Sequence, residues 1–327
     1  MESTIQKLKC GSFHNSRSSV SFSPVHILTF VETSVLISLP KALFDERMRP
    51  GDPYFNYCHW PYEPPNPGTG KLRPSALLFR AIADMPHGEW VCQVVQAIQR
   101  GIGDFRSVYG IKQIDGQWAL EIYIYDYARQ DRIVSIERLV EACAGQLVLP
   151  NSVNPKTPYF MFSIDLTEQA ATQNGSLDSV HVYIGNPGSD VSSGIAYEFT
   201  PTGRQLENFY FFFDAQKHQD QIIDKLQCSV FSESWSVPIE QLYRTELKNC
   251  HTICLANKRT CDTIYYSGVD VDQLLFFLDW QGYPHEFIRF VHDRRSQLDH
   301  LRYDVGVDYR AIDGQLEFIK HGLYGVF

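Results

Sequence analysis

Residues 203–215, GRQLENFYFFFDA, bring an amide, a phenol and several aromatic rings into one short segment. A β-strand directs successive side chains to opposite faces. The two faces hold Phe209, Phe211 and Phe213 on one side, and Asn208, Tyr210 and Phe212 on the other. Both faces are apolar enough to be covered, yet the second carries polar tips. This pattern indicates a dry site that contains a few hydrogen-bonding groups.

Two further segments show the same alternation. One face carries Glu121, Tyr123 and Tyr125 in the first segment, and His181 and Tyr183 in the second. The opposite face is aliphatic, with Leu120, Ile122, Ile124, Val180, Val182 and Ile184. Helices outside a barrel would cover the aliphatic face, so the polar and aromatic tips would converge on a lumen. The alternative is a filled barrel or sandwich core whose tyrosines satisfy one another.

A strand–turn–strand–helix pattern positions these residues and recurs along the chain. Residues 107–127 read as a hairpin with a tight Asp115-Gly116 turn, and a helical spacing of apolar residues follows. Similar units are expected in residues 194–214, 252–280 and 303–327. Near-repeats of this kind indicate one repeated supersecondary unit. Because the unit is a hairpin plus a helix, several copies can close into an antiparallel barrel with helices outside.

The N-terminal quarter is less regular. Residues 28–40 read as a strand, residues 71–79 as its partner, and the Pro/Gly-rich stretch between them as a loop. We therefore expect one domain over residues 1–327. Residues 1–80 form an irregular part with the first strand pair, and residues 81–327 form the repeated hairpin–helix units.

Composition and charge exclude several classes of function. The net charge of −9 argues against a nucleic-acid partner, which needs a basic face. No apolar run is long enough for a membrane span, and the N-terminus lacks the apolar core of a signal peptide. We therefore expect a cytoplasmic protein with no membrane partner. The 8 cysteines are scattered without metal-site spacing, which favours reduced structural thiols.

Short stretches along most of the chain resemble the ABBA (PT-barrel) prenyltransferases. RQLENFYFFF is similar to a strand of the bacterial aromatic enzymes, and IKHGLYG resembles their closing strand. VETSVLI resembles the first strand of the indole and cyanobactin enzymes, and KLRPSALLF resembles its paired strand. The resemblance implies an α+β fold, a ten-stranded antiparallel barrel of repeated α-β-β-α units with a ring of helices outside.

The resemblance also implies roles for particular residues. Asn208, Tyr210 and Lys320 match positions that contact the prenyl diphosphate, and Tyr324 matches a residue that lines the acceptor site. Glu32 matches the carboxylate that accepts a hydrogen bond from the acceptor, so it is the expected catalytic residue. Arg73 matches an arginine of the paired strand.

The implied reaction ionises a carbon–oxygen bond of an allylic diphosphate and transfers a dimethylallyl (C5) group to an aromatic, indole-type acceptor. The leaving diphosphate needs cations in a dry site, and the further candidates are Arg73, Lys112, His181 and Lys258. Aromatic faces stabilise an allyl cation without attacking it, and the expected shield is Tyr123, Tyr183, Tyr210 and Phe212. The expected acceptor contacts are Trp118, Glu121, Glu207 and Tyr324, with Glu121 and then Glu207 as alternatives to Glu32 for proton acceptance.

The chain departs from the resembled pattern in ways that bear on metal dependence. A diphosphate-binding Lys of the aromatic enzymes is replaced by Glu121, and the magnesium-binding Asp of some members falls near Ser34. The missing Asp favours metal-independent chemistry, whereas the reduced number of cations favours Mg²⁺ as a neutralising cofactor. The sequence leaves this choice open.

Other functions remain compatible with the sequence. The acceptor can be a side chain of a cyclic peptide instead of a small natural product. A non-catalytic barrel that binds a hydrophobic ligand would share the aromatic lumen but would need no cluster of cations at one end. In a structural protein with a filled sandwich core, Glu32, His181 and Lys320 would all point to solvent.

Overall fold

The computed structural model describes residues 39–150, 154, 156–186, 193–229, 231, 238–312 and 315–327. All of them belong to one compact unit, Leu36–Phe327. In these parts of the chain, no helix has the length and apolar character needed to cross a membrane.

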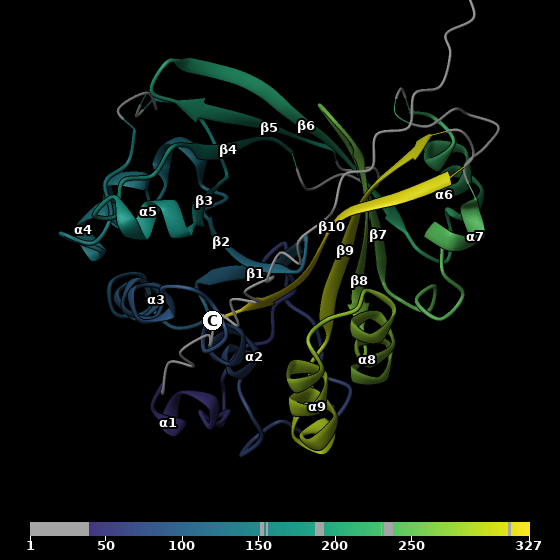
Figure 1. Ribbon diagram of the computed structural model, residues 1–327, viewed down its shortest axis with the longest axis horizontal. Coiled ribbons are helices and arrows are strands. Elements are labelled where there is room, and N and C mark those ends of the chain that lie inside the picture. The colour runs from purple at the N-terminus through teal and green to yellow at the C-terminus, as the bar shows by residue number, and fades with distance from the viewer. Residues whose placement is uncertain are drawn as a thin grey trace, which may run out of the picture. The chain divides into compact units, whose positions relative to one another are not determined.

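Ten antiparallel strands form a closed barrel (Figure 1). Each strand pairs with its neighbours in the chain, and β1 closes the barrel by pairing with β10 from Val108↔Val326 to Ile114↔Lys320. The strands are β1 Ser107–Ile114, β2 Gln117–Tyr125, β3 Met161–Leu166, β4 Val180–Asn186, β5 Ser193–Thr200, β6 Gly203–Asp214, β7 Thr252–Lys258, β8 Asp262–Val269, β9 Tyr303–Ile312 and β10 Gln315–Val326. The predicted α+β fold with a ten-stranded antiparallel barrel is confirmed at this level.

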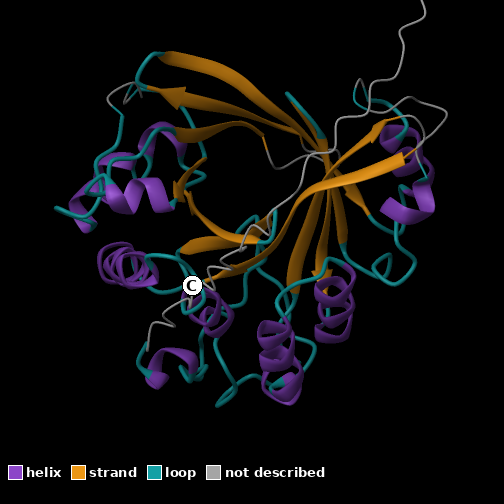
Figure 2. Ribbon diagram, in the orientation of Figure 1, coloured by secondary structure: helices purple, strands orange, loops and turns teal. Residues whose placement is uncertain are grey.

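Helices lie outside the ring of strands (Figure 2). The described helices are α1 Lys41–Phe44, α2 Ser75–Ile82, α3 Gly88–Ile102, the 3₁₀ turn η1 Arg129–Asp131, α4 Ile136–Ala142, α5 Glu168–Thr172, α6 Gln219–Leu226, α7 Ile239–Leu242, α8 Val271–Trp280, α9 His285–Asp293 and α10 Arg295–Leu298. The main hydrophobic core lies between these helices and the outer faces of the strands. Leu120, Ile122 and Ile124 are fully buried there, as the alternation predicts.

Local sequence signals explain the hairpins and several helix ends. Asp115 and Gly116 both have positive φ angles, of 49° and 76°, which is the backbone that a two-residue hairpin turn requires. Helix α8 begins with a capping box, in which the Asp270 carboxylate accepts from the Gln273 N–H and the Gln273 side chain bonds back to the Asp270 N–H.

One predicted strand is wrong. Residues 71–79 were expected to pair as a strand, but Ser75–Ile82 form helix α2, whose Leu77, Leu78 and Phe79 are fully buried. Pro74 directly before the first helical residue is a common helix-start signal. The ten strands that close the barrel all lie between Ser107 and Val326. The expected strand at 28–40 lies outside the described residues except for its last two positions.

Candidate functional site

The inward faces of the strands form a lumen that changes character along the barrel axis. The lumen consists of two adjoining cavities, of about 440 and about 60 Å³. The larger, which we call the polar chamber, is lined by Lys112, Ile114, Ala119, Glu121, Tyr123, Asp165, Thr167, Leu177, Asp178, Ser179, His181, Tyr183, Glu198, Glu207, Asn208, Tyr210, Lys258, Tyr265, Lys320 and Tyr324. The smaller, the apolar chamber, is lined by Tyr57, Cys58, Val108, Tyr123, Tyr125, Tyr127, Phe160, Met161, Tyr183, Gly194, Tyr210, Phe212, Tyr265 and Tyr324.

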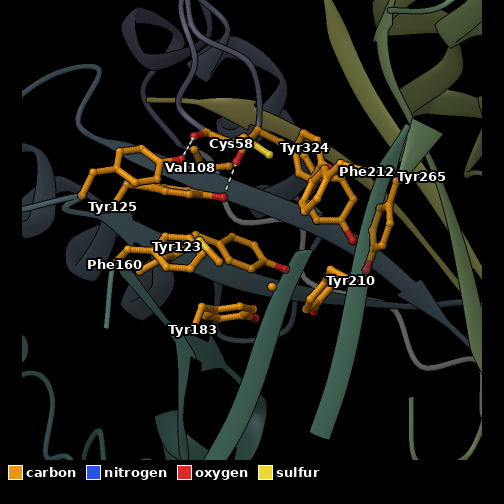
Figure 3. Close-up of a pocket in the computed structure, with 14 residues that line it drawn as sticks. Cys58, Val108, Tyr123, Tyr125, Phe160, Tyr183, Tyr210, Phe212, Tyr265 and Tyr324 are labelled. Atoms are coloured by element: carbon orange, nitrogen blue, oxygen red, sulfur yellow. Dashed lines mark hydrogen bonds between the residues drawn. The ribbon is translucent and has the colours of Figure 1, made fainter. Parts of the chain in front are cut away.

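Five tyrosines line both chambers and separate them. This tyrosine belt consists of Tyr123, Tyr183, Tyr210, Tyr265 and Tyr324. Figure 3 shows the rings of this belt around a common space. The distance between the ring centroids of successive members is 5.7–6.4 Å, in the order Tyr210, Tyr183, Tyr123, Tyr324 and Tyr265. Burial raises the pKa of Tyr324 to about 12 and raises the pKa of each of the other four well above its usual value, which favours neutral phenols.

Two glycines, on the strands that flank β10, make room for the belt. A Cβ at Gly110 on β1 would lie 2.8 Å from the Tyr324 ring, and a Cβ at Gly306 on β9 would lie 2.4 Å from the Tyr265 ring. Real Cβ atoms do not approach other atoms so closely, so any larger residue at these positions displaces a tyrosine.

The loop that carries Tyr57 and Cys58 lines the apolar chamber. The Tyr125 and Tyr127 hydroxyls donate to the carbonyl oxygens of Tyr57 and Cys58, as the dashed lines in Figure 3 show. The Tyr57 N–H donates to the Asp304 carboxylate at 2.7 Å. Burial raises the pKa of Asp304 to about 7. The loop is therefore fixed to the barrel by three hydrogen bonds.

Lys258 and Lys320 share one buried carboxylate in the polar chamber. Lys258 Nζ lies 2.8 and 2.9 Å from the two Asp308 oxygens, and Lys320 Nζ lies 3.2 Å from one of them. Burial acts to raise the pKa of Asp308, but the charges of the two lysines lower it below its usual value. The neighbouring charge of Lys258 lowers the pKa of Lys320. Two cations that share one anion leave this part of the chamber positive.

Lys112 on β1 compensates for the glutamate at position 121. Its Nζ forms an ion pair with Glu121 and lies 3.7 Å from Asp165. The Glu121 carboxylate also accepts from the Tyr123 hydroxyl at 2.7 Å and from the Ser163 hydroxyl. The resembled aromatic enzymes have a lysine where this chain has Glu121, and Lys112 on the adjacent strand β1 supplies a cation at that place.

His181 lies between two carboxylates. Its Nδ1 is 2.6 Å from Glu207 and its Nε2 is 3.3 Å from Asp165. Burial acts to lower the pKa of His181, but these two acids raise it well above its usual value. Both ring nitrogens of His181 thus face a carboxylate.

A β-bulge directs Glu207 into the lumen. Ala196 on β5 pairs with Asn208, whereas Tyr197 pairs with Leu206, so Glu207 is the extra residue of β6. Such a bulge changes the phase of side chains along a strand. As a result Glu207 and Asn208 both line the polar chamber. Residues 206 and 209 both have exposed side chains.

The structure brings most of the predicted site residues together. The polar chamber contains Lys112, Glu121, Tyr123, His181, Tyr183, Glu207, Asn208, Tyr210, Lys258, Lys320 and Tyr324, and Phe212 lines the apolar chamber. The prediction that Tyr123 and Tyr183 face the lumen is confirmed. Glu32 lies outside the described residues.

Two predicted residues lie elsewhere. Arg73 precedes helix α2 and bonds to Asp104 at 2.8 Å and to Asp52 at 3.3 Å, outside both chambers. Trp118 packs against Tyr283 and Phe287 on the outer face of the barrel, with ring centroids 6.0 and 5.3 Å away. Trp118, an expected acceptor contact, therefore lies outside the lumen, since its position on β2 is out of phase with Glu121 and Tyr123.

Sequence reasoning did not select several residues of the lumen. These are Tyr57, Asp165 and Tyr265. Ser163, Asp304 and Asp308, which bond to lumen residues, were not selected either. The alternation in YDVGVDYR would have placed residues 304, 306 and 308 on one face of β9. The loop that carries Tyr57 had no periodic signal from which its position could be inferred.

No group of three acidic, histidine or cysteine side chains is arranged to hold a metal ion within the described parts of the chain. No protein-family model matches the chain. A search of curated proteins finds no significantly similar sequence.

Proposed function

We propose that the protein is an aromatic prenyltransferase with the ABBA barrel architecture, which transfers a dimethylallyl group to an indole-type acceptor. The observation that carries the proposal is the division of the lumen by the tyrosine belt. A chamber with Lys112, His181, Lys258 and Lys320 adjoins an apolar chamber, and neutral phenols lie between them.

Each part of the lumen suits one part of the reaction. The diphosphate binds in the polar chamber, where Lys258 and Lys320 neutralise the charge that develops as the carbon–oxygen bond breaks. The allyl cation forms at the tyrosine belt, whose ring faces stabilise it by cation–π interaction. The arene approaches from the apolar side of the belt, so the cation meets the arene before the water of the polar chamber.

The size of the apolar chamber favours a small prenyl group. A cavity of about 60 Å³ has room for roughly four to six water-sized groups. A five-carbon chain fits this space better than a chain of ten or more carbons. The aromatic acceptor then requires the loop at Tyr57 to shift or the arene to share the space of the belt.

The arenium intermediate must lose a proton to a base. Among the described residues, Glu121 is the best-placed carboxylate, because the belt residue Tyr123 donates directly to it. Proton transfer breaks the ring C–H bond, returns its electron pair to the arene and protonates Tyr123, which passes its own proton to Glu121. Glu32 stays a prediction for the same role.

Calorimetric binding of dimethylallyl thiodiphosphate, a non-ionising analogue, tests the proposal. We expect saturable micromolar binding by the parent protein and at least about tenfold weaker binding by Lys320→Ala. Lys248→Ala, whose ammonium lies over Tyr243 rather than in the lumen, is the matched control. A screen of indoles and cyclic peptides with dimethylallyl diphosphate, read by mass spectrometry, then identifies the acceptor class.

A second candidate is a non-catalytic barrel that binds a hydrophobic ligand. One observation favours it: each lysine of the polar chamber is already ion-paired with a carboxylate. Absence of analogue binding, together with binding of an apolar dye, would support this candidate over the enzyme. His181 and Lys320 line a chamber, which argues against the filled-core alternative for the described residues.

A further inference from the structure

The polar chamber carries more negative than positive charge. Its lining has four basic side chains, Lys112, His181, Lys258 and Lys320, against five acidic ones, Glu121, Asp165, Asp178, Glu198 and Glu207. Asp308, which bonds to two of the lysines, adds a sixth carboxylate. A diphosphate brings several further negative charges. Coulomb repulsion in a partly buried site therefore opposes its binding unless another cation enters with it.

The charges are also unevenly distributed across the chamber. The positive side lies on β7 and β10, where Lys258 and Lys320 share Asp308. The negative side lies on β3, β4 and β6, where one imidazole ring faces both Asp165 and Glu207. An anion bound to the lysines would thus face a surplus of negative charge. This arrangement suits a cation between the anion and the acidic side.

The bulge in β6 places two oxygen ligands next to each other on that side. Glu207 and Asn208 are adjacent in the chain and both line the chamber. Asn208 is 4% exposed, and its Oδ1 has no hydrogen-bond partner among the described residues. Its amide nitrogen donates to the Tyr210 hydroxyl at 2.8 Å, which leaves Oδ1 as a buried acceptor. A buried carbonyl oxygen without a partner costs free energy, which a bound cation would recover.

We propose that this chamber binds the prenyl diphosphate as its Mg²⁺ complex, with the Glu207 carboxylate and Asn208 Oδ1 as the protein ligands of the metal. The inference rests on the proposed function. Mg²⁺ is commonly held by one or two protein oxygens, substrate phosphates and water, so a site with three preassembled acidic ligands is not needed. Asn208 pairs across strands with Lys258, which places the metal beside the phosphate-binding lysines.

His181 and Asp165 act as positioning residues in this arrangement. The His181 Nδ1–H bonds to one Glu207 oxygen and fixes the orientation of the carboxylate. Asp165 holds the opposite nitrogen of the same ring. Groups that orient a metal-ligating carboxylate change metal affinity by about 10- to 100-fold when they are removed.

Calorimetry with dimethylallyl thiodiphosphate, in Mg²⁺ and in EDTA, tests the metal site without any need for turnover. We expect EDTA to weaken analogue binding by the parent at least about tenfold. Glu207→Gln is the decisive variant because its effect has a definite sign. If Glu207 binds the metal, the variant weakens binding about 10- to 100-fold in Mg²⁺. If Glu207 only repels the diphosphate, the variant strengthens binding in both conditions.

Glu198→Gln is the matched control, since it removes the same charge from another side chain of the same chamber. We expect it to leave the dependence on Mg²⁺ intact. Asn208→Leu, which keeps the side-chain size, is the second test and should raise the Mg²⁺ concentration needed for half-maximal binding. Circular dichroism confirms that each variant is folded.

The outcomes separate this inference from the proposed function. Equal analogue binding in Mg²⁺ and EDTA would overturn the metal site and leave the prenyltransferase proposal standing. Tighter binding by Glu207→Gln in Mg²⁺ would also overturn it. If the parent does not bind the analogue under either condition, the proposed function fails and the inference fails with it.

Discussion

Replacement of Asp308 by asparagine is expected to destabilise the protein while it strengthens anion binding. The Asp308 carboxylate accepts from Lys258 at 2.8 and 2.9 Å and from the Thr263 hydroxyl at 2.7 Å, and lies 3.2 Å from Lys320. Its side chain is 7% exposed, so the ion pairs are poorly screened. The introduced amide would keep one acceptor oxygen but would leave two nearby lysines without a counterion.

The magnitude follows from the burial of the pairs. Removal of one partner of a buried ion pair costs about 3–5 kcal/mol. Because Asp308→Asn keeps one acceptor oxygen, we expect the free energy of unfolding to fall by about 3 kcal/mol, the lower end of this range. At roughly 2–4 °C per kcal/mol, the melting temperature should fall by about 6–12 °C. Because the pKa of Asp308 is lowered in the folded protein, its contribution is present at neutral pH and is lost as the pH falls through that lowered pKa.

Thermal unfolding and calorimetry with inorganic diphosphate measure the two effects together. Asp308→Asn should bind diphosphate more tightly than the parent, and saturating diphosphate should restore part of the lost melting temperature. Asp262→Asn is the control: Asp262 is 3% exposed on the neighbouring strand, and burial raises its pKa, so loss of its charge should cost little. An unchanged melting temperature and diphosphate affinity in Asp308→Asn would refute this reasoning, as would equally strong destabilisation by Asp262→Asn.

Three further outcomes are expected. Trp118→Ala should lower the free energy of unfolding by at least about 2 kcal/mol in urea titrations and leave analogue binding unchanged, because the ring packs outside the barrel. Asp304 should make the free energy of unfolding fall as the pH rises from 5 to 8, because its folded-state pKa of about 7 lies above that of the unfolded chain. Urea titrations of Asp304→Asn over the same pH range should lack this decline. Phe212→Ala should enlarge the apolar chamber and shift calorimetric preference from the dimethylallyl towards the geranyl thiodiphosphate.

The strands and the inward face of the lumen could be predicted because both depend on local patterns. The Asp115-Gly116 turn fixes the register of its hairpin, and a period of two then places Tyr123 on the lumen side. The same rule selects His181 and Tyr183 on β4. This alternation depends only on the order of residues within one strand, so it can be applied without knowing what surrounds the strand.

The remaining features depend on contacts between distant parts of the chain. The sequence could not show whether Glu207 faces the lumen or the outside of the barrel, because a β-bulge breaks the alternation of side chains at this residue. Arg73 was assigned to the site by resemblance, but its carboxylate partners lie 21 and 31 residues away in loops. Residues 71–79 were predicted as a strand although they contain the start of helix α2, because the apolar run at residues 76–79 is too short to show a periodicity that distinguishes helix from strand.

The order of residues along β6 links the two chambers to a sequence of chemical steps. Asn208 lines the polar chamber, Tyr210 belongs to the belt and Phe212 lines the apolar chamber. Inward-facing residues of one strand are separated by about 6.6 Å, twice the rise per residue. In the proposed reaction, a diphosphate at the level of Asn208 places the first carbon of its prenyl group near Tyr210. The cation then forms where neutral phenols surround it, and a five-carbon chain is long enough to reach the level of Phe212 and the arene.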